Sequence, residues 1–249
     1  SDCADAGIIV MTAGPSVKPG EIMDRIGLAQ VNLRVMKDVM NKIKAYTNDV
    51  IIIIVSNPVD LLTYYAQNYF DYPKEKIIGT GTLLDTARFR RIIGNKYFVD
   101  TKNVHGYILG EHGGTAMATW SLTNIAGIPY SDFDKHFKAE TPFDKEAVIN
   151  EVKTVGFEIL QSKGFTNFGV AKSVERIIKA IHTNELSVLP VSTSMEGEYG
   201  IQDIAISVPC IMSNEGIKQK LEINLTEEEL GQLRASAEYL KGIFEKLEK

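Results

Sequence analysis

The sequence of 249 residues predicts an α/β fold in two parts. Residues 1–81 are expected to form a partial Rossmann domain with a doubly wound parallel sheet, and residues 82–249 a second, α+β domain. In the first part, short apolar runs alternate with helical periods, which is typical of parallel strands joined by right-handed helical crossovers. In the second part, helical periods precede a hairpin pattern, which favours an α+β arrangement.

Three short apolar runs predict the strands of the parallel sheet. Residues Ile8–Met11 precede a loop rich in Gly and Pro, and Val50–Val55 is a β-branched run without polar alternation. A run that is apolar on both faces is typical of a strand in a parallel sheet that helices cover on both sides. The short run Ile77–Ile78 predicts the third strand.

Three helices are expected to connect these strands. The first begins near Ile26, and its apolar residues recur at helical spacing. That apolar stripe consists of Leu28, Val31, Val35, Val39 and Ile43, with Arg34 and Lys37 on other faces. The second helix covers about residues 59–69, and the third runs from about Leu84 to Ile93, where Gly94-Asn95 is expected to stop it.

The second part is expected to contain two helices, a hairpin and a C-terminal helix. Apolar residues recur at helical spacing over 148–159 and 170–181. The hairpin pairs residues 188–194 with 204–208, where alternation predicts a strand with one exposed face. Thr226 to Glu229 forms a capping box at the start of the last helix. The apolar stripe of that helix consists of Leu230, Leu233, Ala237, Leu240, Phe244 and Leu247.

Composition argues against several classes of protein. The formal net charge is −5 and the pI is near 5.5, so no nucleic-acid partner is expected. No apolar run approaches the length of a membrane span, so no membrane partner is expected either. The two cysteines, Cys3 and Cys210, are too few for a disulfide framework. They favour a reducing compartment, and we expect the cytoplasm.

Polar residues that follow the predicted strands are the first candidates for a ligand site, because doubly wound sheets bind ligands beyond the carboxyl ends of their strands. Asn57 follows the second strand, although it also fits a helix N-cap. Gly79 and Gly81 follow the third strand, but Leu84 stands where a dinucleotide fingerprint has its third glycine, so no phosphate loop is expected there. Arg25 follows the first loop and is also compatible with a solvated surface residue.

Three further residues are candidates for acid–base chemistry. Asp85 and Arg88 share a face of a predicted helix, where a simple intrahelical ion pair is the alternative. His112 lies in a glycine-rich turn where the backbone can approach a ligand, although a lone histidine is more often structural. No metal is expected, because metal-ligand spacing is absent among the other histidines, which are His105, His136 and His182.

Five motifs occur in order along the chain. They are TAG…KPGE…DR at Thr12–Arg25, VSNPVD at Val55–Asp60, GTGTLLDTARFR at Gly79–Arg90, GYILGEHG at Gly106–Gly113 and GFTNFGVA at Gly164–Ala171. Together they resemble the NAD-dependent lactate/malate dehydrogenase family, and within it the bacterial L-lactate and L-2-hydroxyisocaproate dehydrogenases. The family also has an amino-terminal strand, a GxGxxG turn and an acidic ribose-binding residue, which this sequence lacks. We expect Ser1 to align just before the family's fourth strand, about two βαβ units into the fold.

The resemblance implies an oxidoreductase that transfers hydride reversibly between NADH and a 2-oxo acid, with residues 82–249 as the substrate domain. It implies that His112 donates and accepts the proton, that Asp85 holds one imidazole nitrogen, and that Arg25 polarises the carbonyl. Arg88 would clamp the substrate carboxylate with its planar guanidinium. We expect His112 to titrate near its reference pKa of about 6.5. The other family positions are Asn57 and Thr166 beside the substrate, and Val55, Asn57, Thr80 and Val170 at the nicotinamide.

The substrate side chain is expected to be uncharged. In the family, one loop position separates lactate from malate enzymes, and it aligns here with Val17 or, without a gap, with Pro19. Neither residue can pair with a second carboxylate, which disfavours malate. Gly114 is a further departure, since Asp or Asn commonly follows GEHG, and it puts only the local turn geometry in doubt. Malate dehydrogenase remains the enzymatic alternative, and an inactive fragment that retains only subunit contacts is the alternative from another class.

The last expectation concerns regulation and assembly. Allosteric bacterial lactate dehydrogenases hold fructose 1,6-bisphosphate at a subunit interface with an Arg and a His, and Arg90 and His105 stand at those places. Family members without this activation carry the pair too, and in that case both residues would make interface hydrogen bonds. The resemblance implies a homo-oligomer, either a tetramer or a dimer.

Overall fold

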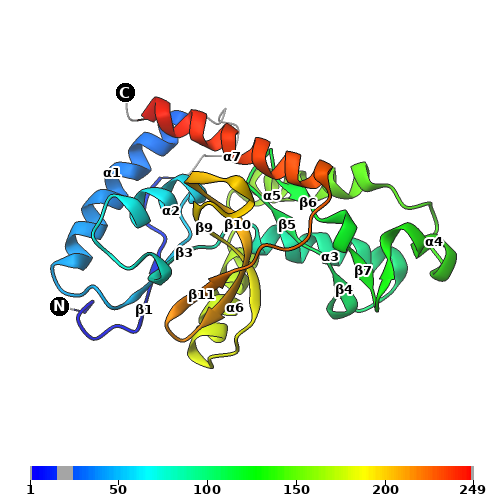
Figure 1. The fold of residues 1–249 in the computed structure, drawn as a ribbon, viewed down its shortest axis with the longest axis horizontal. Coiled ribbons are helices and arrows are strands. Elements are labelled where there is room, and N and C mark those ends of the chain that lie inside the picture. Colours follow the sequence, from blue (N-terminus) through cyan, green and yellow to red (C-terminus); the bar gives the residue numbers. More distant parts are fainter. Residues whose placement is uncertain (1, 16–24, 248–249) are drawn as a thin grey trace.

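The structure, a computed structural model, describes residues 2–15 and 25–247, and its main sheet has six strands in the order β1-β2-β3-β9-β10-β11 (Figure 1). The parallel strands are β1 (Ile8–Met11), β2 (Ile51–Ile54) and β3 (Ile77–Gly79). The antiparallel strands are β9 (Val188–Glu196), β10 (Gln202–Ser213) and β11 (Gly216–Lys220). The two sets join where Gly79 of β3 pairs with Ser192 of β9. The expected α/β class is confirmed.

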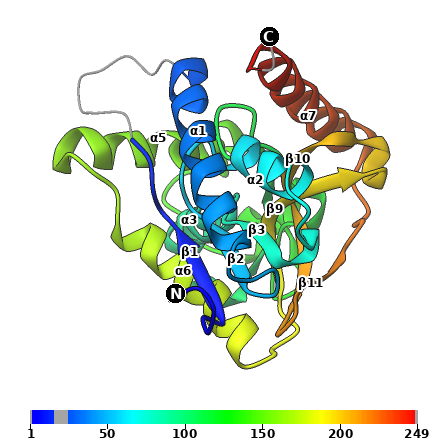
Figure 2. The ribbon, with the colours of Figure 1, turned by 90° about the vertical axis from the view of Figure 1, so that its left-hand side faces the viewer.

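The α-helices of the described residues are α1 (Arg25–Lys44), α2 (Val59–Asn68), α3 (Leu83–Tyr97), α4 (Phe133–His136), α5 (Lys145–Lys163), α6 (Phe168–His182) and α7 (Glu227–Leu247). Of these, α2, α3, α6 and α7 contact strands of the main sheet, and α5 packs against α3. α1 and α2 lie side by side over the parallel strands (Figure 2). α7 crosses the top of Figure 1, from the second part of the chain to α1. None of the helices in the described ranges is long and apolar enough to cross a membrane.

The burial of β2 follows from its sequence. All four of its isoleucines are buried, and alternate ones enter different hydrophobic clusters. Ile52 and Ile54 share a cluster with Met36 of α1, whereas Ile51 and Ile53 share one with residues of α6, β9 and β10. The predicted strand with two buried faces is therefore confirmed.

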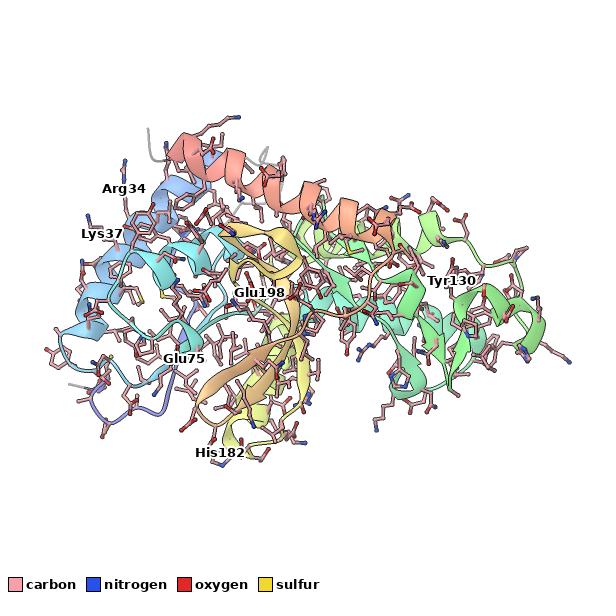
Figure 3. All side chains as sticks on the ribbon, viewed as in Figure 1. Arg34, Lys37, Glu75, Tyr130, His182 and Glu198 are labelled. Atoms are coloured by element: carbon pink, nitrogen blue, oxygen red, sulfur yellow. The ribbon has the colours of Figure 1, made fainter. Side chains whose placement is uncertain are left out.

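The apolar stripe predicted for α1 was partly wrong. Its fully buried side chains include Met36 and Met40, while Val31 is 44% exposed. The helix is rotated relative to the prediction because the two long, flexible methionines, which were not counted in the stripe, fill the space above β2. Arg34 and Lys37 point away from the sheet, as expected (Figure 3).

The predicted end of α3 was also wrong. The helix continues through Gly94-Asn95 to Tyr97 and ends at Phe98, which has a left-handed backbone with φ of 55°. The chain then folds back over the helix, and a Cβ on Gly94 would lie 2.9 Å from the Val99 carbonyl oxygen. Gly94 therefore permits a close backbone approach inside the helix instead of ending it.

Two further differences concern the second part. Residues 204–210 of β10 are buried throughout, so the predicted exposed face is absent, because the strand lies inside the sheet between β9 and β11. Small strands of two residues each were not predicted, since a run that short carries no periodicity. They are β4 (Val104–His105), β5 (Ile108–Leu109), β6 (Met117–Ala118), β7 (Asn124–Ile125) and β8 (Ile128–Pro129).

The C-terminal helix matches its prediction. The backbone N–H of Glu229 donates to Thr226 Oγ1 at 3.2 Å, and the backbone N–H of Thr226 donates to Glu229 Oε2 at 3.0 Å. This reciprocal pair is the predicted capping box. Leu233 and Leu240 are almost fully buried, so the apolar stripe docks on the core.

Candidate active site

The turn from β3 into α3 sets up the site. Gly81 has a φ of 50°, and a Cβ there would lie 2.6 Å from the Ser192 backbone nitrogen, a combination that only glycine accommodates. The backbone N–H of Thr82 donates to Ser207 Oγ at 3.0 Å, which fixes the start of α3 against β10. Asp85 consequently lies in the first turn of α3, where the helix dipole favours a carboxylate.

Two predicted residues, His112 and Arg88, contact the predicted Asp85. His112, in the turn between β5 and β6, has its Nδ1 2.6 Å from Asp85 Oδ2. Arg88 Nη1 donates to Asp85 Oδ1 at 3.3 Å. The Asp85 and Arg88 side chains are 9% and 15% exposed, and the His112 side chain is 29% exposed. The intrahelical ion pair of the alternative interpretation therefore exists, but it forms part of a larger cluster that opens to solvent at the imidazole.

The electrostatics of the cluster keep His112 charged. The Asp85 carboxylate raises the pKa of His112 from 6.5 to about 9, although burial opposes this rise. Burial alone would raise the pKa of Asp85, but the charges and hydrogen bonds of His112 and Arg88 outweigh it and lower that pKa. The expectation that His112 titrates near its reference value was wrong, because it did not include a buried carboxylate in contact. At neutral pH the imidazolium carries a proton that it can donate.

Helix α5 lies directly behind the guanidinium of Arg88. A Cβ on Gly156 of α5 would lie 3.2 Å from Arg88 Nη1. Any larger residue at Gly156 would press on the guanidinium. The absence of a side chain there therefore allows α5 to pack closely against α3 at the site.

The residues that follow β2 and β3 lie at one edge of the sheet. The backbone N–H groups of Val55 and Thr80 continue the hydrogen bonding of the parallel strands, and both side chains are half-buried. Asn57 is exposed, and its Oδ1 accepts a hydrogen bond from the Val59 backbone N–H at 3.3 Å. Since Pro58 occupies the N-cap of α2, the alternative of Asn57 as the N-cap was off by one residue.

Two other predicted residues lie where α5 passes into α6. Thr166 is exposed in the connection, and Val170 is half-buried in the first turn of α6. A Cβ on Gly169 would lie 3.1 Å from the Leu84 side chain, so the start of α6 packs against α3 one residue before Asp85. The connection therefore lies close to the part of α3 that carries the cluster.

The Arg25 side chain lies outside the described residues, as do Val17 and Pro19, although α1 begins at Arg25. Arg90 Nε donates to the Gly106 carbonyl oxygen at 3.1 Å, and its guanidinium lies over the Tyr107 ring at 5.3 Å from the centroid. His105 is exposed in β4.

Sequence reasoning missed Asp60. Asp60 is the last residue of the VSNPVD motif, and its side chain contacts the turn that holds His112. Asp60 is 2% exposed, and its Oδ2 accepts a hydrogen bond from the His112 backbone N–H at 2.8 Å. The available signal was an acidic residue among the apolar residues Val59, Leu61 and Leu62 at the start of a predicted helix.

The turn that holds His112 is also fixed by α7. The backbone N–H of Glu111 donates to Ser236 Oγ at 2.9 Å. Thr115 Oγ1 donates to Glu111 Oε2 at 2.6 Å and lies 2.8 Å from Ser236 Oγ. A Cβ on Gly110 would lie 2.8 Å from Ser236 Oγ, so α7 lies directly on the turn.

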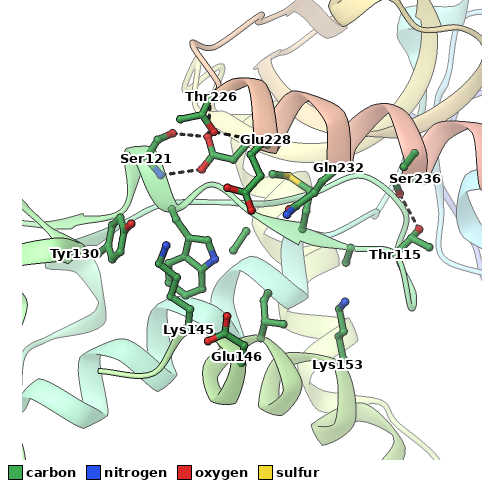
Figure 4. A pocket seen from close by; sticks show the side chains of 17 residues that line it. Thr115, Ser121, Tyr130, Lys145, Glu146, Lys153, Thr226, Glu228, Gln232 and Ser236 are labelled. Carbon is green, nitrogen blue, oxygen red and sulfur yellow. Dashed lines mark hydrogen bonds between the residues drawn. The ribbon is translucent and has the colours of Figure 1, made fainter. Parts of the chain in front are cut away.

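A cavity of about 560 Å³ lies on the outer side of this contact, between α5 and α7 (Figure 4). Thr115 and Ser236 line one end of it, and Lys145, Glu146 and Glu228 line the remainder with others. His112, Asp85 and Arg88 are not among its described lining residues. The cavity is therefore separate from the candidate active site.

No group of three potential metal-ligating side chains occurs in the described ranges 2–15 and 25–247. His182 lies at the C-terminal end of α6, on the lower side of the molecule in Figure 3. The chemistry that the described cluster offers is proton transfer at an imidazole beside a guanidinium that can bind a carboxylate.

Comparison with known protein families matches almost the whole chain. Residues 1–79 match the family described as lactate/malate dehydrogenase, NAD binding domain, and residues 82–249 match the lactate/malate dehydrogenase, alpha/beta C-terminal domain. The L-lactate dehydrogenase 2 of Clostridium acetobutylicum is 56% identical over 246 residues, which cover 99% of this chain and 77% of that protein. The L-lactate dehydrogenase of Selenomonas ruminantium is 45% identical over 240 residues, 96% of this chain and 76% of that protein.

A solved structure is similar over the same range. The minor L-lactate dehydrogenase from Enterococcus mundtii, crystallised in a ligand-bound form, superposes with a TM-score of 0.90 at 37% sequence identity. The match covers 98% of this chain and 77% of that one.

Proposed function

Because this chain belongs to the lactate/malate dehydrogenase family, we propose that His112, Asp85 and Arg88 carry out the reversible reduction of a 2-oxo acid by NADH. The activity is that of an NAD-dependent L-lactate dehydrogenase. The observation that supports these residue roles is the contact of one buried carboxylate with both an imidazole and a guanidinium. A proton donor and an anchor for a carboxylate are thereby held on one side of α3.

This geometry supports the roles proposed for Arg88, Asp85 and His112, and the family resemblance supports those proposed for Arg25, Asn57 and Thr166. Arg88 binds the substrate carboxylate, for which a planar guanidinium with two parallel N–H donors is suited. Asp85 holds Nδ1 of His112, which leaves Nε2 to deliver its proton to the carbonyl oxygen. Arg25 polarises the same carbonyl, and Asn57 and Thr166 lie beside the substrate.

NAD is the cofactor of the family, and when bound it supplies or accepts the hydride. The residues present fit its nicotinamide end. Val55 and Thr80 lie at the carboxyl edge of the parallel strands, where doubly wound sheets bind nucleotides, and Asn57 adds a polar group. Val170 completes this proposed set. The sequence contains no GxGxxG turn, so no residue is assigned to the pyrophosphate.

Substrate selection is the direct test of this function. Pyruvate and 2-oxo acids with longer alkyl chains are expected to exceed oxaloacetate in kcat/KM by about 100-fold, or about 2.7 kcal/mol. The reason is that neither Val17 nor Pro19 can pair with a second carboxylate. Loss of NADH absorbance with each acid measures the ratio. Faster turnover of oxaloacetate would identify a malate dehydrogenase, and no turnover of any 2-oxo acid would contradict the proposed function.

We also propose a domain division, a cellular location and an oligomeric state for the protein. The chain divides near residue 81 into a cofactor-binding part and a substrate part, and the protein acts in the cytoplasm as a homo-oligomer, a tetramer or a dimer. The free thiols of Cys3 and Cys210 are consistent with a reducing compartment.

Regulation by a sugar bisphosphate is a separate proposal, which concerns Arg90 and His105. If the two residues bind fructose 1,6-bisphosphate between subunits, the effector should lower the KM for the 2-oxo acid. Arg90→Gln should abolish that response and leave turnover without the effector unchanged. Substrate saturation curves with and without the effector provide the measurement. Curves of the unaltered protein that superimpose would show that both residues serve only structural contacts.

A further inference from the structure

Asp60 connects three segments at the back of the candidate site. It lies in the first turn of α2, and its Oδ2 accepts the backbone N–H of His112 at 2.8 Å. Its Oδ1 accepts the hydroxyl of Ser192, on β9, at 2.6 Å. Asp60 and Ser192 are 2% and 0% exposed. The carboxylate is thus buried, fully engaged and in contact with the main chain of the residue that transfers the proton.

The charge of Asp60 needs an explanation beyond these two hydrogen bonds. Removing a carboxylate from water is costly, and a neutral acceptor could satisfy one N–H and one hydroxyl at lower cost. The first turn of a helix favours a negative charge, but only modestly. The backbone hydrogen bond brings Asp60 next to His112, and the charge of His112 lowers the pKa of Asp60.

We propose that Asp60 is a positioning residue for the catalytic histidine. It fixes the main chain of His112, and its charge, together with that of Asp85, stabilises the imidazolium. This inference rests on the proposed function, because it concerns the proton that His112 delivers. The Asp60 carboxylate thereby helps to keep His112 protonated as the pH rises.

The charged groups around both residues agree with this role. Around His112, the charges of Asp85 on α3 and Asp60 on α2 raise its pKa, and the charge of Arg88 on α3 lowers it. Burial raises the pKa of Asp60 to about 6, although the hydrogen bonds from Ser192 and His112 oppose it, and the charge of Glu111 acts in the same direction as burial. Asp60 is therefore ionised at neutral pH and loses its charge as the pH falls through about 6.

Asp60→Asn tests the proposal, since asparagine keeps the volume and one acceptor oxygen. NMR titration reads His112 directly, because the chain has four histidines and His112→Gln assigns the signal. The expected result is a lower His112 pKa, since a nearby opposite charge favours the charged form. The alkaline limit of 2-oxo acid reduction should move down by the same amount. Asp203→Asn, at an exposed position, is the matched control for net charge and should shift neither quantity.

Ser192→Ala is the second variant. It removes one of the two hydrogen-bond donors to Asp60, so Asp60 should protonate at a higher pH. The step in the His112 NMR signal that accompanies Asp60 protonation near pH 6 should therefore move to higher pH. If Asp60→Asn does not fold, this step decides the question. A His112 titration unchanged in Asp60→Asn, or a step that is absent or unmoved in Ser192→Ala, would overturn the proposal. The NMR titration needs no turnover, so an inactive protein that shows the expected shift would contradict the proposed function and leave the charge coupling intact.

Discussion

Replacing His112 by Gln is expected to lower kcat/KM for reduction of a 2-oxo acid about 1,000-fold, because the reaction loses its proton donor. The variant should stay folded, since glutamine keeps the backbone N–H that binds Asp60. Steady-state rates and circular dichroism measure the two effects. His182→Gln, at an exposed position on α6, is the matched control and should retain full activity.

The same substitution should remove a pH dependence. With a His112 pKa near 9, reduction by the unaltered protein should persist at neutral pH and decline as the pH rises through about 9. The raised pKa also stabilises the folded protein fully below about 6.5, and that contribution is lost as the pH rises through about 9. Thermal unfolding measured from pH 6 to pH 10 should show this loss, and His112→Gln should lack it. A His112→Gln enzyme that keeps near-normal turnover would show that another group transfers the proton.

Replacing Arg88 by Lys is expected to lower kcat/KM about 100-fold or more. An ammonium offers a point charge in place of two parallel donors, and it cannot contact Asp85 and a substrate carboxylate in the same plane. The loss should be much smaller for a ketone that lacks the carboxylate, which separates substrate binding from damage to the fold. Arg91→Lys, at an exposed position on the same helix, is the control.

One result would contradict the proposed role of Arg88 in binding the carboxylate. Equal losses for the 2-oxo acid and for the ketone would show that Arg88 acts on the structure of the cluster and does not bind the carboxylate. In that case another cation must hold the substrate.

Periodicity predicted the larger elements because their burial is regular. The isoleucines of β2 and the stripe of α7 read directly from the sequence, since each buries a repeating set of side chains. The end of α3 could not be read in this way. Gly94 lies in the helix because the chain returns over it at Val99, which is a tertiary contact without a local signature.

Less of the candidate site could be predicted from local sequence patterns. Asp85 and Arg88 are one helical turn apart, so their shared face follows from spacing alone. The contact of His112 with Asp85 spans 27 positions, and only the family resemblance suggested it. Asp60 escaped prediction because its partners, His112 and Ser192, lie 52 and 132 positions away. A raised histidine pKa likewise depends on distances that no local pattern contains.

The contact between Ser236 and the turn of His112 has a consequence for how the protein is made. Ser236 and Glu111 are 125 positions apart, and the chain emerges from the ribosome with its N-terminus first. Until α7 has been synthesised, the turn can form neither this hydrogen bond nor the packing contact of Gly110 with α7. Helix α7 can pack on the turn only after it has left the ribosome, so the turn that holds His112 reaches the geometry described here late in folding.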